Sequence, residues 1–185
     1  MNPSVPPIDF ERLWEIVSQQ FRCGLHSDHG PLHWRRVEQN GLLLAESSRA
    51  DVLVVRLFAL FHDSKRENEF SDPDHGKRGA AYARELRGEF FQVSDEQFEL
   101  LDYACTWHTD QAHHTDPTIG TCWDADRLDL GRVGIAPDPA YMNTQSGREL
   151  AGGGLRFRGD HEQEVDKLSA DILWGWDTQC LHRDV

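Results

Sequence analysis

Residues 49–63 read RADVLVVRLFALFHD, and this stretch decides the fold. Between Asp51 and His62 it is apolar nearly all the way round a helix, which is typical of a helix buried on every side. We therefore predict a central helix that ends at His62 and Asp63. Two ionisable groups at the inner end of such a helix are costly to bury without partners. Either the helix ends in solvent here, with Asp63 capping the next segment, or a cation compensates the pair.

The rest of the chain shows further helical patterns and no strand pattern. Asp9 is a plausible N-cap, and Pro31 suits the first position of a helix. A Ser-x-x-Gln capping box at Ser94 and Gln97 predicts another helix start. We predict an all-α fold, a single-domain helical bundle over residues 1–185. Apolar spacings of three and four place its helices at residues 9–21, 31–48, 49–63, 71–88, 94–108, 118–131 and 161–178.

Residues 133–160 break this helical pattern. The segment contains Pro137, Pro139 and the glycine triplet 152–154. A stretch this long inside a compact domain is usually either functional or mobile. We expect it to be irregular and to act as a lid over a functional site.

The composition limits the class of protein and its partners. With 38% hydrophobic and 28% charged residues, the chain has the balance of a soluble globular protein. A net charge of −13 argues against a nucleic acid polymer or an anionic membrane as partner, because both need a basic face. A phosphorylated small molecule stays compatible, because a bound divalent metal can invert the local field. The sequence leaves the oligomeric state open.

Cysteine usage and the N-terminal sequence favour a cytoplasmic protein. The four cysteines form no C-x-x-C pair, so free thiols in a reducing compartment are expected. The first residues show no signal-peptide pattern, and no apolar run is long enough to span a membrane.

The chain has ten histidines, many for its length, and several of them lie with an aspartate on different predicted helices. Helical bundles build metal sites in this way, with one or two ligands from each of several helices. Neutral imidazole and carboxylate are good ligands for divalent zinc, iron, manganese or cobalt. Such an ion would compensate the burial of the pair that ends the central helix. The residues concerned are His33, His62, Asp63, His75, His108 and Asp126.

The order of these residues resembles the H…HD…H…H…D signature of the HD-domain metal-dependent phosphohydrolases. The flanking segments are similar too, and the resemblance covers about residues 30–132. It implies an HD-type helical bundle, a binuclear metal centre and hydrolysis of a phosphate ester or anhydride. The segments are HGKRGAAYARELRG (75–88), like the family's H-x-x-x-G-A helix, YACTWHT (103–109), like its helix ending in histidine, and DADRLD (124–129), like its Ala-Asp-x-Leu motif.

The resemblance implies four core metal ligands and a second metal position that shares the aspartate of the His-Asp pair. The core ligands would be His33, His62, Asp63 and Asp126, while His75 and His108 would complete the second position. The alternative to a ligand role for His75, which lies in a predicted turn, is that it only caps a helix. Asp124 is a rival to Asp126, which we prefer because it follows alanine and precedes Arg127-Leu128, as in the family motif. The implied cofactor is one or two ions of Fe, Mn, Co, Ni or Zn, with Mg as a further option.

The family further implies that a metal-activated hydroxide attacks the phosphorus of a phosphorylated small molecule, such as a nucleotide. Many members read HD-x-x-K, but here that lysine position is Arg66, preceded by Lys65. Either cation could hold a substrate phosphate, and arginine would do so in bidentate fashion. We therefore assign catalytic roles to Asp63, Lys65 and Arg66. Predicted substrate contacts are Arg36, Arg127, His113, His114 and Tyr141, with a solvated loop as the alternative for the two adjacent histidines.

Two other functions share this ligand pattern. HD-type binuclear iron oxygenases use histidine and carboxylate ligands with dioxygen, and a non-catalytic HD module could bind a nucleotide as a sensor. The basic residues near the motif favour hydrolysis over the oxygenase, and the full ligand set argues against the sensor.

Overall fold

The structure, a computed structural model, describes residues 8–24 and 27–154. In these ranges it contains seven α-helices, three short helical turns and no strand, which confirms the all-α prediction. The α-helices are α1 (Phe10–Gln19), α2 (Pro31–Ser48), α3 (Val52–Phe61), α4 (His75–Leu86), α5 (Asp95–Trp107), α6 (Pro117–Leu128) and α7 (Gln145–Glu149), and the turns are η1 (Asp129–Val133), η2 (Pro139–Tyr141) and η3 (Leu150–Gly154).

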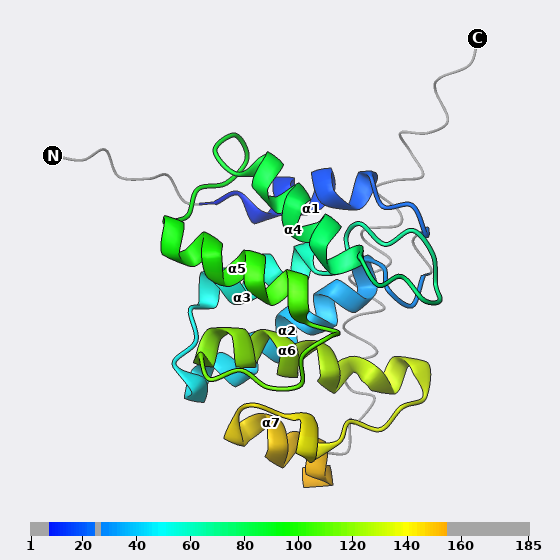
Figure 1. Cartoon of the computed structure of the whole chain (residues 1–185), viewed down its shortest axis with the longest axis vertical. Coiled ribbons are helices and arrows are strands. Elements are labelled where there is room, and N and C mark those ends of the chain that lie inside the picture. The colour runs from blue at the N-terminus through cyan, green and yellow to red at the C-terminus, as the bar shows by residue number, and fades with distance from the viewer. Residues whose placement is uncertain (1–7, 25–26, 155–185) are drawn as a thin grey trace, which may run out of the picture. The chain divides into compact units, whose positions relative to one another are not determined.

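Helix α3 is the central element, as its apolar sequence predicts (Figure 1). It contacts α1, α2, α4, α5 and α6, and most of its side chains are buried. The carboxylate of Asp51 accepts hydrogen bonds from the backbone N–H groups of Leu53 and Val54 and starts the helix. At the other end His62 is 0% exposed and Asp63 is 3% exposed. The helix therefore does not end in solvent, and the buried pair needs partners.

The predicted capping signals define the helix starts. Asp9 caps α1 through the N–H of Arg12, and Pro31 occupies the first turn of α2. Ser94 and Gln97 form both hydrogen bonds of the capping box that begins α5.

Two glycines allow α4 to pack closely against the ends of its neighbours. A Cβ atom at Gly79 would clash with the carbonyl oxygen of Phe61, at the end of α3. A Cβ atom at Gly76 would clash with the carbonyl oxygen of Cys105, in α5. The close approach brings the starts and ends of three helices to one place in the core.

The segment 133–160 differs from the irregular stretch that we expected, as far as residue 154. It contains η2, α7 and η3, and α7 contacts α2 and α6. The carboxylate of Asp124 accepts hydrogen bonds from the backbone N–H groups of Asn143 and Thr144, at 2.7 Å each, and from both of their side chains. This long-range anchor orders the chain where local sequence gives no helical pattern. The helix predicted at 161–178 lies outside the described residues and stays a prediction.

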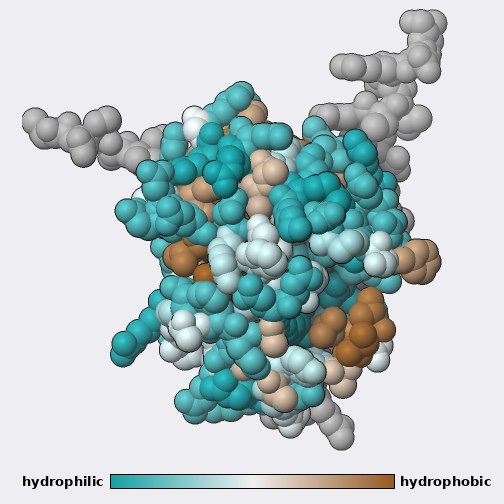
Figure 2. Space-filling view, viewed as in Figure 1, coloured by the Kyte–Doolittle hydropathy of each residue, from teal (hydrophilic) through white to brown (hydrophobic). Residues whose placement is uncertain are grey.

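The described surface is largely hydrophilic in the view of Figure 2. A hydrophobic area lies where Figure 1 draws the segment after α6, and Val133 and Ile135 of that segment are exposed. Among the helices of the described ranges, none combines the length and apolar character needed to cross a membrane.

Candidate metal centre

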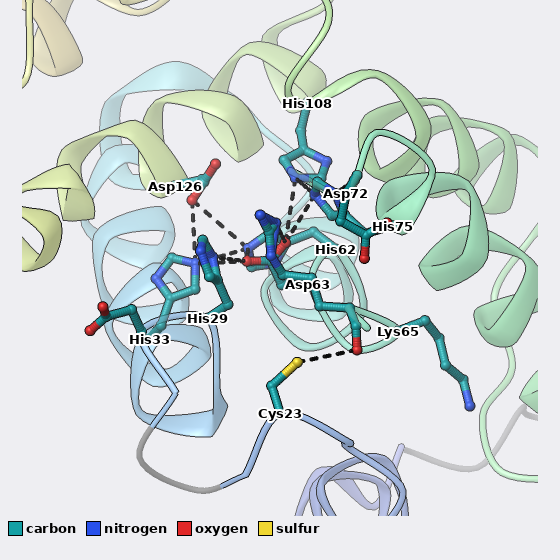
Figure 3. A network of polar contacts seen from close by, with 12 residues as sticks. Cys23, His29, His33, His62, Asp63, Lys65, Asp72, His75, His108 and Asp126 are labelled. Carbon is teal, nitrogen blue, oxygen red and sulfur yellow. Dashed lines mark hydrogen bonds and ion pairs between the residues drawn. The ribbon is translucent and has the colours of Figure 1, made fainter. Parts of the chain in front are cut away.

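The six predicted ligands converge at one place in the core, and they come from the ends of five helices (Figure 3). Five of them are buried, and the side chain of the sixth, Asp126, is 17% exposed. His33 lies in the first turn of α2, His62 and Asp63 follow α3, His75 opens α4, His108 follows α5, and Asp126 lies in the last turn of α6.

The first ion group consists of His33, His62, Asp63 and Asp126. Oδ2 of Asp63 lies 3.7 Å from Nε2 of His33 and 3.8 Å from Nε2 of His62. Oδ1 of Asp126 lies 3.3 Å and 3.8 Å from the same two nitrogens. Nitrogen and oxygen atoms about 2 Å from a common divalent ion would have spacings of this size.

The second ion group consists of Asp63, His75 and His108. It uses the other oxygen of Asp63, because Oδ1 lies 3.1 Å from Nε2 of His75 and 3.7 Å from Nε2 of His108. In each group, ligand atoms from two histidines and Asp63 lie within 4.8 Å of one another. Asp63 is therefore the residue that both groups share.

The protonation of the four ligand histidines follows from their outer neighbours. In each ring, Nδ1 faces an oxygen that accepts hydrogen bonds and cannot donate one. The acceptors are the carbonyl groups of Phe58 and Ala59 for His62 (3.1 Å each), of Asp72 for His75 and of Cys105 for His108 (2.7 Å), and the carboxylate of Asp129 for His33 (2.7 Å).

Because Nδ1 carries the proton, the Nε2 lone pairs of all four rings point into the centre. The Nε2 atoms of His33 and His62 are 3.1 Å apart, and those of His75 and His108 are 2.9 Å apart. Lone pairs that face each other at these distances repel unless a positive charge lies nearby. Oδ1 of Asp63 is also buried without a hydrogen-bond donor, which is rare in folded proteins. These imidazole nitrogens and carboxylate oxygens therefore fit a divalent cation in each group.

The pKa values follow from the same arrangement. Burial lowers the pKa of His62 to about 3, so this ring is neutral at neutral pH. Burial would raise the pKa of Asp63 and of Asp126, but the imidazoles of His62 and His33 hold both values below the usual range. Burial likewise opposes the charged forms of His33 and His108. Contacts with Asp126 and Asp129 nevertheless raise the pKa of His33, and contacts with Asp63 and Asp126 raise that of His108. The centre thus attracts positive charge.

The structure brings Asp126, and not its rival Asp124, to the first ion group. Both oxygens of Asp124 face the other way and accept the four hydrogen bonds from Asn143 and Thr144. Its role is therefore to anchor α7.

Arg36, predicted to contact substrate, is connected to the ligand His33 through Asp129. Its Nε donates to Oδ1 of Asp129 at 2.7 Å, and the other oxygen of Asp129 contacts Nδ1 of His33 at 2.7 Å. Partners of this kind orient metal-binding imidazoles. The geometry favours a positioning role for Arg36 in place of the predicted substrate contact.

The guanidinium of Arg127 is also engaged by other parts of the chain. It donates to the backbone carbonyl groups of Gln111, Ala112 and Tyr141, at 2.6–2.7 Å. It joins the loop after α5 to η2, so these donors are not available to a phosphate.

The two cations that follow the His-Asp pair point in different directions. The side chain of Lys65 extends away from the centre in Figure 3, and its Nζ lies 3.6 Å from the centroid of the Tyr82 ring. The predicted catalytic role of Lys65 is therefore not supported by its position. Arg66 is 8% exposed, and its Nη1 lies 3.9 Å from Oδ1 of Asp63. Its Nε is buried without a hydrogen-bond partner.

The three remaining predicted substrate contacts lie on the surface or in a neighbouring aromatic cluster. Tyr141 is 55% exposed, and His113 is exposed. His114 accepts a hydrogen bond from the N–H of Asp116, and its ring centroid lies 5.0 Å from that of Tyr103. Within residues 8–24 and 27–154, no hydrogen bond or ion pair joins these three side chains to the ligands.

One further histidine, which the sequence pattern does not single out, lies at the centre. Nδ1 of His29 lies 2.9 Å from Oδ2 of Asp63. The sequence carries only a weak signal for it: His29 precedes His33 by four residues, but it lies in the turn before α2 and not on the helix itself.

Comparison with known proteins gave a structural match. No protein-family model matches the chain, and no curated protein is significantly similar to it. A solved structure, that of a predicted HD superfamily hydrolase from an uncultured Thermotogales bacterium, is similar with a TM-score of 0.63 and 25% sequence identity. The match covers 90% of this chain and 92% of that chain. This match confirms the predicted HD-type fold, and the two buried histidine–aspartate groups consist of residues for which the HD resemblance implies a metal site.

Proposed function

We propose that the protein is a metal-dependent phosphohydrolase that acts on a phosphorylated small molecule, either a nucleotide or another phosphoester or anhydride. The observation that supports this most is the position of Asp63. It is ionised and buried, and each of its oxygens faces a pair of imidazole nitrogens that cannot donate. A carboxylate placed between two pairs of imidazoles suits a centre that would hold two divalent ions, a common arrangement for displacement at phosphorus.

The chain's own residues hold and orient the reactants. Divalent ions, when bound, polarise a phosphoryl oxygen and lower the pKa of a water molecule. The first ion group and the second ion group would hold them, and Asp63 belongs to both groups. Arg66 supplies a positive charge beside Asp63, and its buried Nε has no partner. A guanidinium with unused donors is suited to stabilise charge on a phosphoryl oxygen.

Metal analysis of protein purified without added metal, paired with a hydrolysis screen, tests the proposal. The screen measures phosphate release from nucleotides and simple phosphoesters with Mn²⁺, Co²⁺, Fe²⁺, Zn²⁺ and Mg²⁺. We expect the wild-type protein to retain metal and to hydrolyse at least one class of compound.

Asp63→Asn provides the matched variant. It removes the shared charge with little change in volume, so we expect it to lose both metal retention and turnover. Asp28→Asn makes the same change at an exposed position and should keep both. Metal-loaded wild-type protein that consumes oxygen but releases no phosphate would instead support the iron oxygenase. Metal-loaded protein with neither activity would support a non-catalytic module.

A further inference from the structure

His29 lies on the solvent side of the candidate metal centre and contacts it through one atom. Its side chain is 17% exposed, whereas those of the four ligand histidines are 0–4% exposed. The 2.9 Å between its Nδ1 and Oδ2 of Asp63 is a hydrogen-bond distance. We propose that His29 is a positioning residue that donates its Nδ1 proton to Asp63 and so fixes the aspartate shared by both ion groups. This inference rests on the metal centre of the proposed function, and not on its reaction.

The other rings of the centre cannot fill this role. With an ion in each group, their Nε2 lone pairs would face the ions while Nδ1 faces outward to an acceptor, so these Nε2 atoms would have no hydrogen to donate to Asp63. The guanidinium of Arg66 lies 3.9 Å from Oδ1, which is too far for a hydrogen bond. His29 also belongs to neither ion group, because its nitrogens lie outside the sets of mutually close ligand atoms. It approaches Asp63 from outside, as an orienting partner does.

The backbone of His29 is held on two sides, which limits where its ring can go. Its N–H donates to Oγ of Ser27 at 3.0 Å, and its carbonyl oxygen accepts from Nε1 of the buried Trp34 at 2.8 Å. Nε of Arg132 donates to the carbonyl oxygen of the preceding Asp28 at 2.7 Å. Nη2 of Arg132 lies 3.4 Å from Nδ1 of His29. The contact between that nitrogen and the ionised Asp63 is shorter and is therefore the stronger interaction.

Asparagine and glutamine separate the donor function from the size of the side chain. An asparagine amide N–H falls near the place of histidine Nδ1, whereas that of glutamine falls near Nε2. We therefore expect His29→Asn to bind metal within a few-fold of wild type. His29→Gln and His29→Ala should bind about 10- to 100-fold more weakly, the usual effect of losing an orienting partner.

The experiment uses the full chain, stripped of metal by a chelator and titrated with Co²⁺ and Mn²⁺. Co²⁺ absorption spectra and Mn²⁺ electron paramagnetic resonance report affinity and coordination independently of turnover. Thermal unfolding of the metal-free variants checks their folding. Asp28→Asn, with an exposed side chain in the same loop, is the control and should bind as wild type does.

Equal weakening in His29→Asn and His29→Ala would overturn the proposal, as would wild-type affinity in all three variants. A Co²⁺ spectrum in His29→Asn with one ligand fewer would make His29 a direct ligand and also overturn it. If His29→Ala does not fold, the comparison of His29→Asn with His29→Gln still decides. Wild-type protein that binds ions in this His29-dependent way but hydrolyses no phosphate would refute the proposed reaction alone. Wild-type protein that binds no ion would refute both.

Discussion

Gly79 determines how closely α4 approaches the buried His-Asp pair. A Cβ atom there would clash with the carbonyl oxygen of Phe61 and would lie 3.1 Å from that of His62. Backbone atoms cannot rotate away, so we expect Gly79→Ala to lower the free energy of unfolding by roughly 1 to 3 kcal/mol. Chemical denaturation measures this change. Gly131→Ala is the control, because a Cβ atom at Gly131 meets nothing within 4 Å, and it should stay within about 0.5 kcal/mol of wild type.

At the same scale, the sequence could predict which residues meet but not where every side chain points. The ligands follow from residue type and from their places at helix ends, which converge once the helices pack. The direction of the Lys65 side chain could not be predicted, because its Nζ lies over the ring of Tyr82, which belongs to another helix, α4. Arg127 lies next to Asp126 in the motif, but carbonyl groups from two distant loops take up its donors. His29 precedes Pro31 and lies outside the helical pattern, so its four-residue spacing from His33 was only a weak signal.

At the scale of elements, Asp72 and Arg78 connect the turn after α3 to the start of α4. Nη2 of Arg78 donates to the carboxylate of Asp72 at 2.6 Å, and its Nε donates to the carbonyl oxygen of Lys65 at 3.1 Å. Burial would raise the pKa of Asp72, but the hydrogen bonds from Arg78 and from the N–H of Glu67 lower it below the ordinary value of 3.8. The carbonyl oxygen of Asp72 also accepts from Nδ1 of His75.

We therefore expect a pH-dependent effect of Asp72→Asn. A carboxylate with a lowered folded-state pKa stabilises the fold fully above its unfolded pKa and loses this effect as the pH falls through the folded value. The variant should be less stable by roughly 1 to 3 kcal/mol at pH 7, and the difference should shrink below about pH 4. Urea denaturation at several pH values measures it. A difference that grows on acidification would contradict the assignment.

Asp124 anchors α7 to α6, through hydrogen bonds from the residues that precede α7. Asp124→Ala leaves the backbone N–H groups of Asn143 and Thr144 without their acceptor, so we expect a loss of roughly 1 to 3 kcal/mol. Hydrogen exchange should increase at residues 143–149 more than in α3. Uniform exchange across both elements would show that α7 is not anchored here. Local sequence could not predict α7, because its anchor lies about twenty residues earlier, in another helix.

At the scale of the whole molecule, metal should stabilise the fold, because the ligands come from five helices. A ligand at 100 times its dissociation constant adds about 2.7 kcal/mol to the free energy of unfolding. For a chain of this length, that corresponds to about 5 to 10 °C in melting temperature. We expect a chelator to lower the melting temperature by this amount and added Mn²⁺ to restore it. Asp63→Asn should respond to neither, and an equal response in wild type and variant would place the ions elsewhere.

Three of the imidazole rings are oriented by backbone carbonyl groups, which affects how far the surrounding sequence can diverge. Main-chain oxygens belong to every residue, so the rings of His62, His75 and His108 keep their orientation when the side chains at their acceptor positions are replaced. Distant descendants of the same ancestor could therefore exchange nearly all flanking side chains and still present the same inward lone pairs. Of the four rings, only His33 depends on a side-chain acceptor, Asp129. A substitution of Asp129 would therefore directly remove the group that orients this ring.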